Sequence, residues 1–147
     1  MTTSIPIGWQ TEPVFPADSP GKKPLIVVVG QDEDTRTMLR TMLELWNYDV
    51  IESFTTEESL NASAGREPSL VLLETTLHFT DSLEDLTMLR ASDGFRHTPS
   101  VMLSGYSQPT YREAALKSGA SAFMVKPVDF DLLRDHITAL VGESFNY

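Results

Sequence analysis

The sequence predicts an α/β fold, a three-layer α/β/α sandwich around a five-stranded parallel sheet. From residue 25 onward, short apolar runs alternate with stretches of helical period, and the alternation repeats five times. Most of these runs are apolar at successive positions, which is typical of strands that a parallel sheet buries on both faces. The five predicted strands cover residues 25–29, 50–54, 70–73, 100–103 and 122–125.

Helices are predicted in the intervals between the strands, and capping residues and glycines indicate where they begin and end. The first follows Asp32 and Asp34, either of which can cap its first amides. The second opens with Thr55 and Glu58 at capping-box spacing. The other predicted boundaries are an end of the second helix at Gly65, a third helix from near Ser82, a fourth over 109–118 and a fifth from Asp129 to Gly142.

Composition narrows the classes of function. A chain of 147 residues with 41% apolar content can bury one core, which favours a single domain. Its net charge of -10 opposes direct binding of a nucleic acid backbone. There is no cysteine, no signal peptide pattern and no apolar run long enough to cross a membrane. We therefore expect a soluble cytoplasmic protein with no direct nucleic acid or membrane partner.

The chain divides into a proline-rich arm over residues 1–24, a folded domain over 25–142 and a short tail over 143–147. Five prolines interrupt any helical or strand period in the arm. Two interpretations of the arm stay open: an extension without fixed contacts, as termini commonly are, or a segment that docks on the domain or on a partner. The second rests on its apolar side chains, which are Ile5, Ile7, Trp9, Val14 and Phe15.

The predicted strands end in residues of unusual chemistry. Ligands of open parallel sheets bind beyond the carboxyl ends of the strands, where the winding of the chain reverses. Four segments far apart in the sequence are therefore expected to share one cleft. These segments are Gly30-Gln31, Glu74, Ser104-Gly105 and Lys126-Pro127.

Residues 25–142 resemble the receiver domain of bacterial response regulators in two-component and phosphorelay signal transduction. The resemblance is carried by four stretches, VVVGQDEDTRTMLRTMLELWNYDV, PSLVLLETTLHFTDSLEDL, TPSVMLSG and GASAFMVKP. They are similar to the family's first strand and helix, its third strand and following loop, its fourth strand and its fifth strand. The resemblance implies a CheY-like, flavodoxin-like (βα)5 fold with sheet order 2-1-3-4-5.

The resemblance also implies a role for each residue of the cleft. Glu74 stands at the position of the phosphorylated aspartate, and Ser104 at that of the switch hydroxyl. Lys126 stands at the phosphate-binding lysine. The remaining equivalences are Gly30, Gln31 and Thr76 at the metal site, Gly105 as the small residue beside the switch hydroxyl, Phe123 as the switch aromatic and Pro127 as the usually cis proline.

Two departures from the family pattern change the expected chemistry. Gly30 and Gln31 replace the acids that hold magnesium, and Mg²⁺ prefers anionic oxygen ligands, so we expect no metal cofactor. Glu74 carries one more methylene than aspartate, which moves its carboxylate outward by about 1.5 Å. In-line attack on a phosphoryl donor depends on position, so phosphorylation by the usual route is disfavoured. Glu74 and Lys126 can instead neutralise each other.

We therefore expect an atypical receiver that is not an enzyme and acts by protein-protein interaction. Its partner, a protein or a second copy, would bind the face formed by residues 109–141, from Pro109 to Val141. In one interpretation Lys126 and Ser104 only support the buried Glu74. In another, Glu74 partly imitates a phosphorylated aspartate and draws in Ser104. Two alternatives also remain: a residual phosphoacceptor of a histidine kinase, and a small-ligand-binding variant with a pocket under Gly30 and Gly105.

Overall fold

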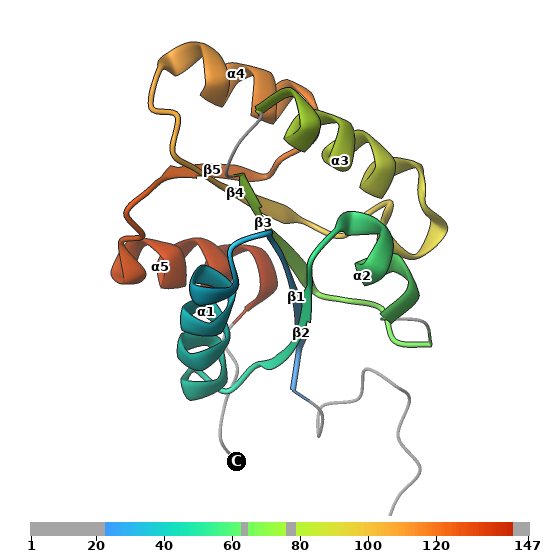
Figure 1. The fold of residues 1–147 in the computed structure, drawn as a ribbon. Helices are drawn as coiled ribbons and strands as arrows, with labels where there is room; N and C mark the ends of the chain where they lie inside the picture. Colours follow the sequence, from blue (N-terminus) through green and yellow to red (C-terminus); the bar gives the residue numbers. More distant parts are fainter. Residues whose placement is uncertain (1–22, 63–64, 76–78, 143–147) are drawn as a thin grey trace, which may run out of the picture.

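The computed structural model describes residues 23–62, 65–75 and 79–142. Five strands form one parallel sheet in the order β2-β1-β3-β4-β5, which confirms the predicted fold class (Figure 1). The predicted arm and tail lie outside the described residues, apart from Lys23 and Pro24. The strands are β1 (Leu25–Val29), β2 (Asp49–Ser53), β3 (Leu70–Thr75), β4 (Ser100–Ser104) and β5 (Ala122–Val125).

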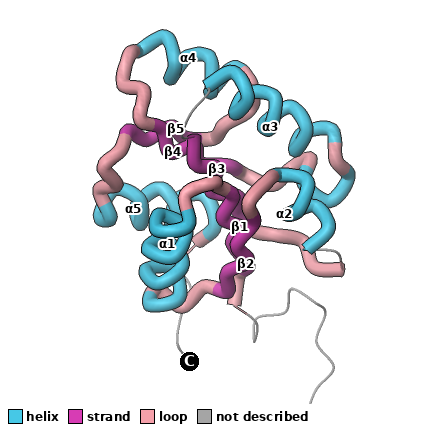
Figure 2. The backbone as a smooth tube through the Cα atoms, in the orientation of Figure 1, coloured by secondary structure: helices cyan, strands magenta, loops and turns pink. Residues whose placement is uncertain are grey.

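Helices cover both faces of the sheet. Figure 2 shows α1 and α5 on one side of the strands and α2, α3 and α4 on the other. A short 3-10 helix, η1, follows α3. Their bounds are α1 (Glu33–Leu45), α2 (Thr56–Ala62), α3 (Phe79–Ala91), η1 (Asp93–Phe95), α4 (Pro109–Lys117) and α5 (Phe130–Val141).

The central strands supply a hydrophobic core on each face. Successive side chains of a strand point to opposite faces, so Ile26 packs with Leu39 of α1 and Leu133 of α5. Val27 packs on the other side with Leu86 of α3. All five of these aliphatic side chains are fully buried. The continuous apolar runs are therefore explained by burial on both sides of the sheet.

Several predicted boundaries differ from those of the structure. The second strand runs over Asp49–Ser53 instead of 50–54, because Asp49 pairs with Leu25 while Phe54 lies past the ladder and is 49% exposed. The third helix begins at Phe79 instead of near Ser82. Ser82 is buried inside the first turns of that helix, so its side chain does not mark the helix start. Elsewhere, β3 and β4 extend beyond their apolar runs to Thr75 and Ser104.

Helix capping follows the sequence signals at two helices. The Thr55 hydroxyl accepts a hydrogen bond from the Glu58 amide at 3.1 Å, and the Glu58 carboxylate accepts one from the Phe54 amide at 2.8 Å. At α5 the Asp129 carboxylate accepts a hydrogen bond from the Leu132 amide. Asp32 occupies the N-cap position of α1, but its carboxylate accepts a hydrogen bond from the Thr35 hydroxyl.

Among the residues that the structure describes, no helix combines the length and the apolar character needed to cross a bilayer.

The Asp129 cap gives a direct test of α5. We expect Asp129→Ala to lower the free energy of unfolding by about 1 kcal/mol, because the Leu132 amide loses its acceptor. Urea denaturation measures this difference. Asp135→Ala, at an exposed position within the same helix, is the matched control and should change stability by less than about 0.5 kcal/mol. Equal losses in the two variants would contradict the capping role.

Candidate functional site

Three of the predicted segments meet where β3, β4 and β5 end. Thr75 pairs with Ser104, and Ser104 pairs with Val125, so the ladder aligns these three strand ends. The Lys126 amide donates a hydrogen bond to the Ser104 carbonyl at 2.7 Å. Gly30 follows β1, the other neighbour of β3. Strand periodicity therefore located a common site.

A short ion pair lies at the centre of this site. Lys126 Nζ lies 2.5 Å from Glu74 Oε2, and it also donates a hydrogen bond to the Thr75 carbonyl at 3.3 Å. The Glu74 side chain is 1% exposed, whereas that of Lys126 is 25% exposed. A buried carboxylate without a counter-charge would be strongly destabilising, so the lysine offsets the cost of burying Glu74. Charge counting along the sequence predicted this contact.

Glycine at position 30 leaves the space that Glu74 occupies. A Cβ atom added to Gly30 would lie 3.0 Å from Glu74 Cβ and 3.3 Å from its Cδ, and closer still to Oε1. Oε1 is buried and has no hydrogen-bond partner among the described residues. Gly30 is therefore needed for a close approach between backbone and side chain, and not for an unusual backbone conformation.

An arginine holds the loop that carries Gly30. Arg36 of α1 donates a hydrogen bond to the Gly30 carbonyl at 2.7 Å, and its Nε lies 3.4 Å from Glu52 Oε1. These contacts tie the end of β1 to α1 and β2. Sequence analysis missed Arg36, because an arginine early in a helix usually faces solvent.

Ser104 makes a different contact from the one expected. Its fully buried hydroxyl accepts a hydrogen bond from the Tyr106 amide at 2.9 Å. Among the described residues, no hydrogen bond joins Ser104 to Glu74. The structure therefore does not show the contact expected if Glu74 drew Ser104 toward it. The hydroxyl instead shapes the turn that leads from β4 toward α4.

The other predicted site residues divide by exposure. Gln31 and Gly105 are exposed, whereas Phe123 is buried in the core between the sheet and α3 and α4. The Lys126-Pro127 peptide bond is cis, as the resemblance implied. Thr76 lies outside the described residues.

A pocket of about 290 Å³ lies beside Gly30 and Glu74. Asp81 and Asp85 of α3 also line it, and Gly105 is not among its lining residues. Sequence analysis did not single out these two aspartates. The available signal was their spacing, because residues four apart share one face of a helix. The complete lining is Val29, Gly30, Gln31, Phe54, Thr55, Leu73, Glu74, Asp81, Ser82 and Asp85.

The pKa values of two carboxyl groups near the cleft are shifted in opposite directions. Burial raises the pKa of Asp85. Thr56 opposes this rise, and the negative charges of Asp81 and Glu84 add to it. The Thr35 hydroxyl lowers the pKa of Asp32, and the positive charge of Lys126 lowers it slightly further. Lys126 thus affects Asp32 in addition to pairing with Glu74.

The sheet order and the charged groups at its carboxyl edge define a doubly wound α/β domain with its site at the switch point. Residues 26–138 match the family model described as the response regulator receiver domain, and the chain belongs to that family. Receiver domains are signalling modules that interact with proteins such as kinases and effectors.

Curated relatives support this assignment. An uncharacterised 14.6 kDa protein of Leptolyngbya boryana is 32% identical over 110 residues, which are 74% of this chain and 84% of that protein. The polar-differentiation response regulator DivK of Brucella anthropi is 22% identical over 81% of this chain and 97% of its own length. The transcriptional regulatory protein PrrA of Mycobacterium tuberculosis is 29% identical over 80% of this chain, which spans only 50% of PrrA.

Solved structures show the same fold. The chemotaxis protein CheY4 of Vibrio cholerae superposes with a TM-score of 0.72 at 18% identity, over 80% of this chain and 98% of that one. A response regulator from Thermotoga maritima gives a TM-score of 0.71 at 22% identity, over 82% and 99% of the two chains.

The contact between Gly30 and Glu74 can be tested by a double-mutant cycle. We expect Gly30→Ala to lower the free energy of unfolding by about 1–3 kcal/mol, because the new methyl group overlaps the Glu74 side chain. The loss should largely disappear in a Glu74→Ala background, where that side chain is absent. Chemical denaturation of the four proteins measures the coupling.

Gly105→Ala is the matched control, since a Cβ there would meet no atom within 4 Å. Its effect should stay within about 0.5 kcal/mol. A Gly30→Ala loss that is the same with and without Glu74 would contradict the steric account.

The raised pKa of Asp85 predicts a pH-dependent stability effect. The folded state binds this proton more tightly than the unfolded chain, so the stabilisation is complete below the ordinary pKa of 3.8 and is lost as pH rises through the folded value. Asp85→Asn should therefore raise the thermal midpoint at pH 7, with the gain vanishing toward pH 3.8. Asp135→Asn, exposed on α5, is the control. A gain of equal size at both pH values would contradict the prediction.

Proposed function

We propose that this receiver domain signals by phosphorylation-independent protein-protein interaction, and that the Glu74 and Lys126 pair replaces the family's metal-assisted phosphoacceptor site. The observation that carries the proposal is the 2.5 Å contact between Lys126 Nζ and the buried carboxylate of Glu74. The pair is electrically neutral as it stands. It therefore creates no excess negative charge that a cation would have to offset.

The residues at the family's magnesium positions do not fit the ion. Gly30 offers no side-chain oxygen, and the space beside it is filled by Glu74. Gln31 offers a neutral amide, and one Glu74 oxygen already contacts Lys126. Mg²⁺ requires several oxygen ligands in octahedral geometry and favours carboxylates. These observations support a receiver that works without the metal.

Phosphoryl transfer to Glu74 is disfavoured by the same geometry. Oε2 is engaged by Lys126, and Oε1 is buried against Gly30. An incoming phosphoryl group carries negative charge, and without a metal its oxygens would be repelled by the carboxylate. Because the carboxylate is enclosed, a donor could reach it only after the ion pair opened.

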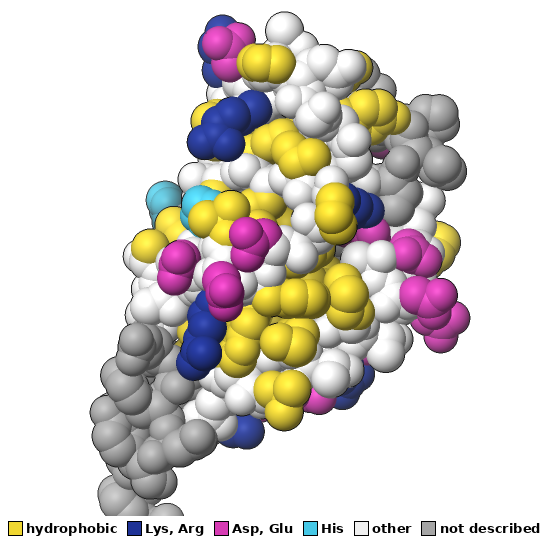
Figure 3. Space-filling view, turned by 90° about the vertical axis from the view of Figure 1, so that its left-hand side faces the viewer, with side chains coloured by type: hydrophobic (Ala, Val, Ile, Leu, Met, Phe, Trp, Pro, Cys, Tyr) yellow, Lys and Arg dark blue, Asp and Glu magenta, His cyan; other side chains and the backbone are white. Residues whose placement is uncertain are grey.

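The surface around β5 is the proposed contact for a protein partner or a second copy. Edge strand β5 lies between α4 and α5 on the left of Figure 1, and Figure 3 turns that side to the viewer. Hydrophobic side chains gather in the middle of this view, with charged side chains around them. The structure leaves Leu116, Val125 and Leu132, one from each of these elements, at least 40% exposed. Such a mixture suits a protein interface.

The ion pair is connected to this surface through the backbone. Lys126 directly follows β5, and its amide bonds the carbonyl of Ser104 at the end of β4. The Ser104 hydroxyl in turn accepts a hydrogen bond from the Tyr106 amide. The centroid of the Tyr106 ring lies 4.9 Å from that of Tyr111 in α4. We infer that a fixed Glu74 and Lys126 pair holds the β5 surface in one arrangement. The domain would then present a constant binding face.

Mass spectrometry after incubation with acetyl phosphate and Mg²⁺ tests the proposal. We expect no phosphoryl adduct on the unaltered chain. The Gly30→Asp, Gln31→Asp, Glu74→Asp triple variant should gain a labile adduct, because it restores the carboxylates that the family uses for metal and phosphate. Circular dichroism establishes that the variant is folded.

Glu74→Gln is the matched control for the unaltered chain. A phosphoryl adduct on the unaltered chain that Glu74→Gln abolishes would overturn the proposal and establish the residual phosphoacceptor instead. A small-molecule ligand of the 290 Å³ pocket would be a separate finding, visible as a thermal shift that Glu74→Gln changes without any added mass.

A further inference from the structure

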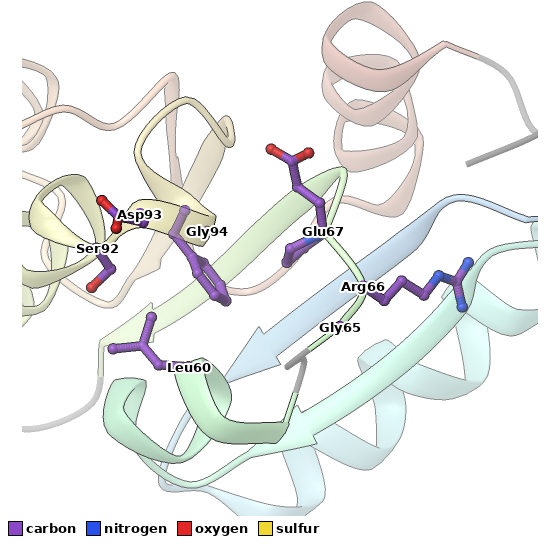
Figure 4. Close-up of a pocket in the computed structure, with 9 residues that line it drawn as sticks. Leu60, Gly65, Arg66, Glu67, Ser92, Asp93 and Gly94 are labelled. Atoms are coloured by element: carbon purple, nitrogen blue, oxygen red, sulfur yellow. The ribbon is translucent and has the colours of Figure 1, made fainter. Parts of the chain in front are cut away.

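A second pocket lies at the opposite end of the sheet from Glu74 and Lys126. Its volume is about 540 Å³, which is within the range that holds a large side chain or a small ligand. It lies between α2, the loop that leads into β3, and the segment that follows α3 (Figure 4). The lining residues are Leu60, Gly65, Arg66, Glu67, Pro68, Ser92, Asp93, Gly94 and Phe95.

The pocket combines an apolar interior with a polar rim. Phe95 is 4% exposed and packs in the core, and Leu60 and Pro68 add aliphatic surface around it. Charged groups such as Glu67 and Asp93 are exposed at the rim. In Figure 4 the side chain of Arg66 extends away from Leu60, so it leaves the opening free. An aromatic or aliphatic side chain is therefore the chemistry that suits the interior.

Arg66 also fixes the place from which residues 1–22 must start. Its guanidinium donates a hydrogen bond to the Lys23 carbonyl and forms a 2.9 Å ion pair with Asp49. The next residues of the same loop are held as well, because the Ser69 amide bonds the Leu25 carbonyl at 2.7 Å. Lys23, the first described residue of the chain, is therefore hydrogen-bonded to a residue that lines the pocket.

We propose that residues 13–16 of the N-terminal segment dock in this pocket, with the Phe15 ring between Leu60 and Phe95. Phe15 precedes Lys23 by eight residues, which can span at most roughly 29 Å when extended. Pro13 and Pro16 flank it and fix their own backbone angles, so less conformational entropy is lost on docking than for a flexible segment.

Tethering favours this occupant over a separate molecule. A side chain joined to the pocket rim by a short linker has an effective concentration on the order of millimolar, so even a weak contact is populated. Aromatic rings that pack edge to face add a further favourable contribution to burial alone. This inference is independent of the proposed function, because the pocket shares no lining residue with the pocket beside Glu74.

Tryptophan fluorescence of the full chain tests the docking. In the Trp9→Phe, Trp46→Phe, Phe15→Trp variant, the only tryptophan stands at the docking position. We expect blue-shifted emission relative to a peptide of residues 1–22 with the same substitutions. Adding Gly94→Leu should return the emission to that of the peptide, because Gly94 lines the pocket and a larger side chain there obstructs docking. A Cβ at Gly94 meets no atom within 4 Å, so the change introduces no clash at that atom.

Ala91→Leu is the matched control, since it adds the same side chain at an exposed position of α3 outside the pocket. Emission equal to that of the peptide in the absence of Gly94→Leu would overturn the proposal. So would a blue shift that appears only as protein concentration rises, because the segment would then dock on a second copy.

Hydrogen exchange gives an independent measurement without tryptophan at position 15. Amides of residues 93–95 should exchange several-fold faster in Phe15→Ser than in the unaltered chain, because the pocket would lose its cover. Identical exchange in the two proteins would contradict the docking.

Discussion

The close approach of Gly30 to Glu74 is the constraint on which the site depends. The carboxylate can be buried because position 30 has no Cβ, and the contact with Lys126 offsets the cost of burying it. The sheet order makes this reach demanding, since β4 separates β5 from β3. Neighbouring strands lie about 4.8 Å apart, so the cation must pass over one whole strand. The long, flexible lysine side chain can do so, and its ammonium then contacts both Glu74 and the Thr75 carbonyl.

A buried ion pair of this kind is better understood as a device for conformational specificity than as a source of stability. Attraction between two charges roughly balances the cost of removing them from water, whereas loss of one partner leaves the other uncompensated. The pair therefore penalises any arrangement in which the end of β5 moves away from β3. In this protein the Lys126 amide also donates a hydrogen bond to the Ser104 carbonyl, so the penalty extends to the end of β4.

The sequence predicted the fold well because burial on both sheet faces leaves a strong pattern of apolar runs. It misplaced β2 by one residue because Phe54 extends the apolar run although its side chain lies outside the ladder. The Glu74 and Lys126 contact followed from charge and strand order. The role of Gly30 did not, because the sequence suggested a vacant pocket under this glycine, whereas the Glu74 side chain fills the space beside it. Asp85 and Arg36 were missed for a related reason: helix spacing shows which residues share a face, but not which face meets the cleft.

Glycine at position 30 and glutamate at position 74 depend on each other. An aspartate at position 30 would collide with Glu74, because even a single Cβ is too close to that side chain. An aspartate at position 74 opposite Gly30 would be shorter by one methylene and would leave unfilled space beside the glycine, at a cost that grows with cavity volume. Each change alone is therefore unfavourable, while the observed pair fills the space and matches its charge with Lys126. The cleft is accordingly a self-consistent packing arrangement, and several simultaneous changes would be needed to place carboxylates at positions 30 and 74 together.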